Sequence, residues 1–141
     1  MGFDNINYTE LIKLNIELGE KLKSKPYEVA ILSNIIVYQS KEVLEYLFRA
    51  EDINVNVVFG DYDNIVQDSK KYYDSNAVII FWELCNIIDG FHYKTELLDD
   101  KQLELVINKT KSEIDFVLLN MKKTSLVLIN TFTSLPFSHS N

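Results

Sequence analysis

Hydrophobic and polar residues follow two different periods along the chain, one typical of helices and one typical of strands. In the first segment, leucines recur every three or four residues, at Leu11, Leu14, Leu18 and Leu22. This spacing predicts an amphipathic helix over about residues 7–24, which Pro26 ends. Four short apolar runs follow, each with the length of a β-strand: residues 28–33, 53–60, 76–82 and 125–132.

The character of each run indicates where its strand lies in a sheet. The first and third runs are apolar at consecutive positions, which is typical of central parallel strands covered on both faces. The second alternates Ile53, Val55 and Val57 with polar residues, which indicates an edge strand. Because helical patterns separate the runs, we predict a mostly parallel sheet with right-handed crossovers. The predicted fold is a single α/β domain over residues 1–141, three-layered and flavodoxin- or Rossmann-like, with four strands in the order 2-1-3-4 and helices on both faces.

The segments between the runs predict the remaining helices. Ser40 is a suitable N-cap for a helix before the second run, and a short helix is expected around residues 62–73. Residues 83–98 predict a helical turn followed by a loop. Asp99 or Asp100 is expected to cap the longest helix. Its inner face is marked at helical spacing by Leu103, Val106, Thr110, Ile114, Val117 and Met121.

Composition and charge narrow the class of protein. Apolar residues make up 47% of the chain and charged residues 25%, which is typical of a globular domain. The net charge of −7 would repel a phosphate backbone, so we expect no nucleic acid partner. The longest obvious apolar run, AVIIFW, is far shorter than the ~20 residues of a membrane span, and the first residues lack a secretion signal. The single cysteine excludes an intrachain disulfide, and we expect a cytoplasmic protein.

The residues that follow the strands form the candidate site, because ligands in such sheets bind beyond the carboxyl ends of the strands. The switch point of a 2-1-3-4 order lies between strands 1 and 3, and Ser33 follows strand 1 as the candidate nucleophile. The candidate substrate-binding residues are Asn34, Gly60, Asp61, Tyr62, Trp82, Glu83, Asn130 and Thr131. These residues are equally typical of ordinary loops and caps.

A serine nucleophile needs a general base, and the base is not evident from the sequence. His92 is expected in an irregular loop and His139 in the tail, and neither belongs to an Asp-x-x-His pattern. We therefore favour a structural role for Ser33 and Asn34, which would cap the sheet and bind backbone. Cys85 and the two histidines lack the spacing of a metal site, so we predict no metal.

Two motifs of phosphate chemistry are only partly matched by the sequence. Asp61-Tyr62-Asp63 is close to the Asp-x-Asp of haloacid-dehalogenase-type phosphatases, where one Asp attacks phosphorus beside Mg²⁺. Gly60 separates it from the strand and Ile65 stands where a small hydroxyl residue is usual, so a turn and helix cap is the favoured interpretation. The four glycines do not cluster into a phosphate loop, and we predict no cofactor.

Several stretches together resemble the N-terminal domain of FkbH-like proteins, a Rossmann-like domain that is also similar to SGNH hydrolases. The resemblance runs roughly from Leu18 to Phe137 and is carried by VAILSN, VNVVFGDYDNIVQDS, NAVIIFWEL and LVLINTF, with Pro136 after them. It implies that the chain is the N-terminal domain of a longer protein in which a haloacid-dehalogenase-type phosphatase domain follows. The best known members load a glyceryl unit from a phosphorylated three-carbon donor onto an acyl carrier protein.

The same resemblance assigns roles to some residues and leaves others unmatched. Ser33 matches the nucleophile position and Gly60 the oxyanion-hole glycine, but Trp82-Glu83 replaces the expected Asn and the Asp-x-x-His block is absent. We therefore expect a non-catalytic or weakly catalytic domain that helps bind an acyl or glyceryl donor, an acyl carrier protein or a partner phosphatase domain. The alternatives are a degenerate SGNH-type esterase or acyltransferase using Ser33, and an interaction module that dimerises through a sheet edge or the first helix.

Overall fold

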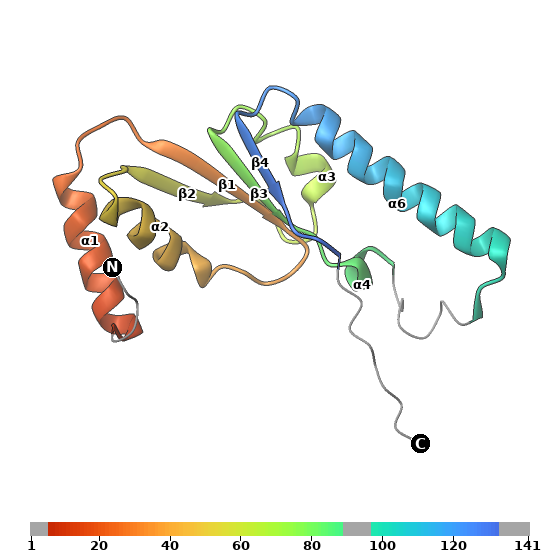
Figure 1. The fold of residues 1–141 in the computed structure, drawn as a ribbon, viewed down its shortest axis with the longest axis horizontal. Coiled ribbons are helices and arrows are strands. Elements are labelled where there is room, and N and C mark those ends of the chain that lie inside the picture. The colour runs from red at the N-terminus through yellow and green to blue at the C-terminus, as the bar shows by residue number, and fades with distance from the viewer. Residues whose placement is uncertain (1–5, 89–96, 133–141) are drawn as a thin grey trace, which may run out of the picture.

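The chain folds as four parallel strands with helices on both faces of the sheet (Figure 1). A computed structural model describes residues 6–88 and 97–132. The strands are β1 (Tyr27–Ser33), β2 (Val55–Phe59), β3 (Ala77–Phe81) and β4 (Leu126–Ile129). The helices are α1 (Tyr8–Lys21), α2 (Ser40–Ala50), α3 (Ile65–Asp68), α4 (Leu84–Ile87) and α6 (Asp100–Asn120). The strand order β2-β1-β3-β4 confirms the predicted α/β Rossmann-like topology.

Each face of the sheet has its own apolar cluster. On one face, alternate residues of β1 and β2 pack with Leu44 and Phe48 of α2. On the other face, Ala30 and Leu32 of β1 join Val117 of α6 in a second cluster. Figure 1 shows α1 and α2 on one side of the sheet and α3 and α6 on the other. The residues of β1 from Val29 to Leu32 are 0–1% exposed, as expected for a strand covered on both faces.

The first helix is shorter than predicted. The Asn7 side chain accepts a hydrogen bond from the Glu10 backbone N–H at 2.9 Å, and the helix then runs from Tyr8 to Lys21 rather than to residue 24. Its buried residues are Leu11 and Asn15, so the helix contacts the rest of the chain through a polar side chain as well as leucine. Asn15 donates from Nδ2 to Glu45 Oε2 of α2 at 3.2 Å.

An ionic cluster around the buried carboxylate of Glu45 joins α1, α2 and β2. Glu45 is 7% exposed, and its carboxylate lies 3.1 Å from Lys41 Nζ and 3.6 Å from the Arg49 guanidinium. Arg49 also donates to the Asn15 side chain at 2.8 Å. Gly19 leaves room for the guanidinium, because a Cβ there would lie 3.0 Å from it. The cluster therefore attaches α1 to α2.

The other helices differ from the prediction at their ends. Gln39, not Ser40, is the N-cap of α2, and Ser40 is its first residue. The helix α3 covers only Ile65–Asp68 of the 62–73 segment. The longest helix begins as predicted, because Asp99 and Gln102 form a reciprocal capping box. No helix in the described ranges is long and apolar enough to cross a membrane.

Candidate functional site

The hydroxyl of Ser33 is engaged in the turn that follows β1. Ser33 is 8% exposed, and its Oγ donates to the Ile35 carbonyl at 2.6 Å and accepts from the Ile35 N–H at 3.0 Å. Its own carbonyl accepts from the Asp63 N–H at 3.0 Å. These bonds are those of a side chain that closes a turn. His92 and His139, the two histidines of the chain, lie outside the described residues, so a catalytic role of Ser33 stays a prediction.

Asn34 closes the switch point between β1 and β3. It is 1% exposed, and its side chain bonds the Glu83 backbone twice: Nδ2 donates to the carbonyl at 2.9 Å and Oδ1 accepts from the N–H at 2.6 Å. The Asn34 N–H donates to the Phe81 carbonyl at 3.1 Å, and its carbonyl accepts from Asn86 Nδ2 at 2.7 Å. The amide side chain predicted to bind substrate thus joins the ends of the two central strands.

The loop after β2 is built around a buried carboxylate that the sequence did not single out. Asp68 of α3 is 3% exposed, and its carboxylate accepts from the Asp61 N–H at 2.6 Å and from Asn64 Nδ2 at 3.1 Å. Gly60 allows this approach, because a Cβ there would overlap the Asp68 carboxylate and lie 2.8 Å from Leu32 Cδ2. The Gly60 N–H donates to the Ile31 carbonyl at 2.9 Å.

The predicted residues of this loop lie at the surface. Asp61 is exposed and Tyr62 is 56% exposed. Asp63 adopts a left-handed conformation with φ of 54°, which Asp tolerates better than most residues. The side chains of the loop therefore face solvent, while the Asp68 carboxylate holds the loop backbone through the Asp61 N–H.

A second pair of hydrogen bonds between a side-chain amide and backbone joins the residues that follow β3 and β4. The Trp82 N–H donates to Asn130 Oδ1 at 2.7 Å, and Asn130 Nδ2 donates back to the Trp82 carbonyl at 3.1 Å. The Trp82 ring is 4% exposed and belongs to the apolar cluster under α6. Glu83 is half-buried, and Thr131 is exposed. Asn34 and Asn130 thus use their amides in the same way, each binding the backbone that follows β3.

A pocket of about 310 Å³ opens beside these strand ends, which we call the strand-end pocket. Its lining residues come from the loop after β2, α3, the segment after β3 and α6: Asp63, Ile65, Val66, Gln67, Trp82, Asn86, Ile87 and Glu113. The pocket places carboxylates and amides beside an apolar wall. Of the predicted substrate-binding residues, Trp82 lines this pocket.

Four polar residues of the strand-end pocket are absent from the predicted substrate-binding residues, namely Asp63, Gln67, Asn86 and Glu113. Glu113 offers the clearest signal in retrospect, because it lies three residues after buried Thr110 on the inner side of α6. A carboxylate at such a position borders the core rather than the solvent. Gln67 and Asn86 belong to short elements in which no periodicity could have marked them.

Cys85 lies next to the pocket but is poorly suited to nucleophilic chemistry. Burial raises the pKa of its thiol, and the neighbouring Glu83 carboxylate, 3.4 Å from Sγ, raises the pKa further. A thiol with a raised pKa holds little thiolate near neutral pH. Within the described residues, no group of three or more His, Cys, Asp or Glu side chains is placed to hold a metal ion.

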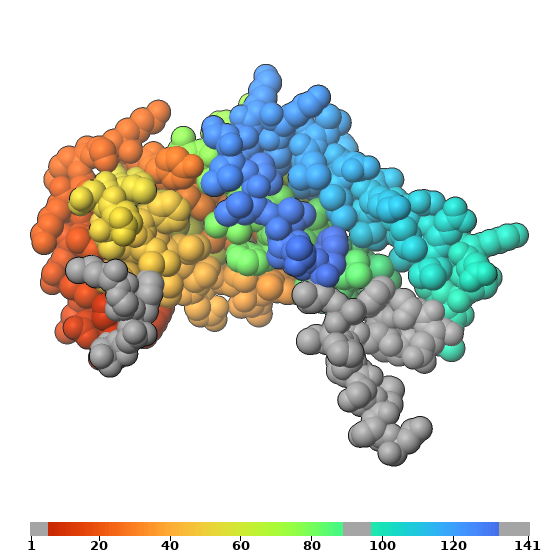
Figure 2. Space-filling model, viewed as in Figure 1, coloured from red at the N-terminus to blue at the C-terminus, as the bar shows by residue number. Residues whose placement is uncertain are grey.

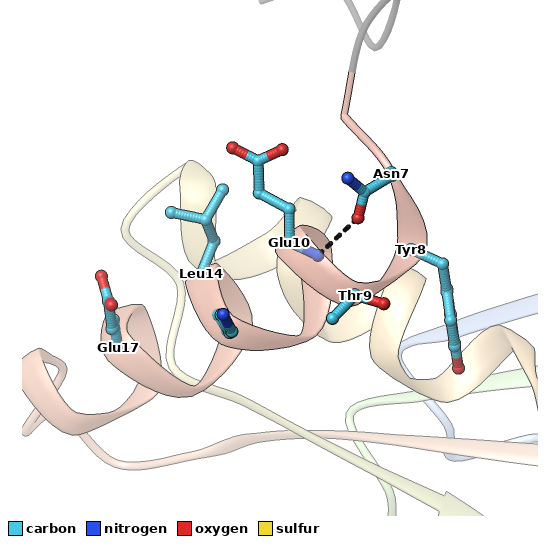
Figure 3. Close-up of a pocket in the computed structure, with 7 residues that line it drawn as sticks. Asn7, Tyr8, Thr9, Glu10, Leu14 and Glu17 are labelled. Atoms are coloured by element: carbon cyan, nitrogen blue, oxygen red, sulfur yellow. Dashed lines mark hydrogen bonds between the residues drawn. The ribbon is translucent and has the colours of Figure 1, made fainter.

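A second hollow, of about 660 Å³, lies along the exposed side of α1 (Figure 3). Its lining residues are consecutive or one turn apart on this helix: Asn7, Tyr8, Thr9, Glu10, Lys13, Leu14 and Glu17. Figure 3 shows that Tyr8 points away from Glu10 and Leu14, so the side chains diverge. A ligand site needs polar groups that converge, and the strand-end pocket remains the better candidate.

The fold and the strand-end residues together define an α/β domain of Rossmann-like topology. The chain matches no protein-family model and no curated protein sequence. Among solved structures it is similar to the N-terminal part of the protein BF1531 from Bacteroides fragilis, described as containing a phosphatase domain complexed with Mg, with a TM-score of 0.71 and 11% identity. The match covers 96% of this chain and 36% of the chain of the BF1531 structure, so this chain spans about a third of the length of that structure. At this identity the likeness shows a shared fold.

Proposed function

We propose that this chain is a non-catalytic accessory domain of an FkbH-like protein, which helps a phosphatase-type domain hold its donor or carrier. The observation that carries the proposal is that Ser33 and Asn34 are buried and bonded to backbone at the switch point. A nucleophilic serine needs its proton directed to a base, whereas Ser33 donates to the Ile35 carbonyl. The similarity to the N-terminal part of a protein that contains a phosphatase domain supports the same domain arrangement.

The chemistry of the strand-end pocket supports a neutral ligand. Asp63 and Glu113 both line the pocket, and their charges would repel a phosphorylated three-carbon donor. Gln67 and Asn86 instead offer amide donors and acceptors to an uncharged polar chain. The pantetheine arm of an acyl carrier protein is such a chain. We therefore assign the pocket to the pantetheine arm rather than to the phosphorylated donor.

Ester hydrolysis tests the non-catalytic part of the proposal. We expect purified protein to hydrolyse p-nitrophenyl acetate no faster than its Ser33→Ala variant. The variant should fold, since removing the hydroxyl affects one local turn and costs about 1 kcal/mol. Robust turnover that Ser33→Ala abolishes would make the chain a serine esterase or acyltransferase.

Calorimetric titration with pantetheine tests the assignment of the pocket. We expect pantetheine to bind and a phosphorylated three-carbon compound, glycerol 3-phosphate, to bind more weakly, because its phosphate meets Asp63 and Glu113. Gln67→Ala should weaken pantetheine binding about threefold to tenfold, the value of one hydrogen bond. Asn56→Ala, at an exposed position of β2 away from the pocket, is the matched control. Absent binding, or binding that Gln67→Ala leaves unchanged, would refute the pantetheine assignment.

A further inference from the structure

The outer edge of β2 carries backbone groups that side chains occupy. Among the described strands β2 pairs with β1 alone, so its other side has no strand partner. Asn54 and Gly60, which flank β2, bond to β1 through their backbone, and in a parallel pair alternate residues turn to opposite sides. Val55, Val57 and Phe59 therefore direct their backbone N–H and C=O groups away from β1. Another strand could join the sheet at β2 only through these outward groups.

Side chains of the ionic cluster occupy the outward groups from the side of α2. Lys41 Nζ donates to the Val57 carbonyl, and Arg49 Nη2 donates to the Val55 carbonyl at 3.3 Å. The Val57 N–H donates to Glu45 Oε1 at 3.5 Å. A cation thus meets each carbonyl and a carboxylate meets the N–H, so each side chain matches the polarity of the group that it covers.

Tyr72 covers the same edge from the other face of the sheet. It follows α3, and its ring packs against the apolar cluster of that face. Its hydroxyl donates to the Phe59 carbonyl at 3.1 Å. The carbonyls of all three outward residues therefore have side-chain donors, and the edge of β2 is covered from both faces.

The helix α1 holds the covering side chains of α2 in place. Asn15 donates to Glu45 Oε2 at 3.2 Å, and Arg49 donates to the Asn15 side-chain oxygen at 2.8 Å and to its backbone carbonyl at 3.1 Å. Long charged side chains lose conformational freedom when they are fixed, and contacts from a second helix limit the conformations that remain open to them. Figure 2 shows the red and orange atoms of α1 and α2 together at one end of the molecule and the cyan to blue atoms of α6 at the other.

The sequence of β2 explains why its edge requires a cover. Val55–Phe59 reads VNVVF, a run of high β-propensity that contains no charge and no proline. Charged residues or proline usually protect the edges of natural sheets, and a bare edge of this composition pairs readily with other chains. In this chain the protecting charges belong to α2 rather than to the strand itself.

We propose that Lys41, Glu45, Arg49 and Tyr72 block the edge of β2, so that a second copy of the chain cannot pair with this strand. The ionic cluster then does more than attach α1 to α2, because it also prevents self-association through β2. The block does not depend on the function proposed for the strand-end pocket, since none of these four residues lines that pocket.

The double variant Lys41→Met/Tyr72→Phe tests the block. It removes the donors to the Val57 and Phe59 carbonyls and keeps the pair of Glu45 and Arg49. Methionine retains an unbranched apolar stem and phenylalanine retains the packed ring, so the variant should fold, as circular dichroism and urea denaturation will show. In sedimentation velocity, the concentration at which half of the chains are associated should fall at least about tenfold relative to wild type, because the freed carbonyls can accept from a second copy.

A matched control and a localised readout accompany this test. Lys122→Met/Tyr73→Phe makes the same two chemical changes at exposed positions outside α2 and β2, and it should associate no more than wild type. Hydrogen exchange followed by mass spectrometry should show that Lys41→Met/Tyr72→Phe, unlike wild type, gains protection at residues 55–59 as its concentration rises. If that double variant is unfolded, Tyr72→Phe alone decides, because it removes one hydroxyl and should give a smaller increase of the same kind.

Three results would overturn the block. The first is a folded variant that associates no more than wild type or the control. The second is association that protects other segments and leaves residues 55–59 unchanged. The third is a wild-type protein that itself gains protection at residues 55–59 with concentration, since β2 would then be free to pair.

Discussion

Replacing Gly60 by alanine should destabilise the fold more than its small size suggests. The added methyl group would overlap the Asp68 carboxylate and lie 2.8 Å from Leu32 Cδ2, both in the buried interior. Overpacking of this kind costs about 1–3 kcal/mol. Displacing the carboxylate also breaks its 2.6 Å bond from the Asp61 N–H, and hydrogen bonds to charged groups are worth about 1.5–3 kcal/mol. Together we expect a loss of about 2.5–6 kcal/mol in the free energy of unfolding.

Urea denaturation followed by circular dichroism measures this loss. Gly19→Ala is the matched control, because its Cβ would meet the end of the flexible Arg49 side chain at 3.0 Å. Alanine is also favoured over glycine in a helix by about 0.5–1 kcal/mol, so the control should remain within about 1 kcal/mol of wild type. In the double variant Gly60→Ala/Asp68→Ala the carboxylate is absent. The loss in its free energy of unfolding should therefore be smaller than the sum of the losses in the two single variants. A Gly60→Ala protein as stable as wild type would refute the steric reasoning.

Two further predictions concern the ionic cluster and the thiol. Glu45→Gln should lower the free energy of unfolding by about 1–3 kcal/mol in urea denaturation, because the partly buried Arg49 guanidinium loses its counterion. Exposed Glu20→Gln should change it by less than about 0.5 kcal/mol, and equal effects of the two variants would contradict the cluster's role. Because the pKa of Cys85 is raised, its alkylation by iodoacetamide should reach half its maximal rate at a higher pH than that of a cysteine in an unstructured peptide. Glu83→Gln should move this midpoint to lower pH, and a variant with the wild-type midpoint would show that Glu83 does not raise the pKa.

The strand order was predictable because the strongest sequence signals coincide with the deepest burial. The run from Val29 to Leu32 is continuous in the sequence and almost fully buried in the sheet. The extent of α3 was not predictable in the same way. Asp68 and Ser69 lie in the middle of the expected helix, and both are buried. The Asp68 carboxylate accepts from the Asp61 N–H, and the Ser69 hydroxyl donates to the Val66 carbonyl. Local polar bonds of this kind compete with helix formation, and hydrophobic periodicity does not report them.

The meeting of the strand ends at one edge of the sheet was predictable, but the contacts of the side chains there were not. The register pairs Ser33 with Phe81, so the residues after β1 and β3 do meet at one edge of the sheet. The direction of each side chain depends on tertiary structure. Asn34 and Asn130 bind backbone, and a sequence gives no sign that their amides are used in this way. The spacing of Glu113 from Thr110 places it near the core, but its contact with the strand-end pocket depends on how α6 packs.

The attachment of α1 through its ionic cluster has a consequence for how the molecule opens. Neither apolar cluster of the sheet, as far as the described residues define them, includes a residue of α1. The helix can therefore leave while the sheet and its remaining helices stay assembled, and such partial openings require less free energy than global unfolding. Backbone amides of α1 should exchange with deuterium well before those of β1 and β3. The chain then behaves as two cooperative units of unequal stability, although it contains one sheet.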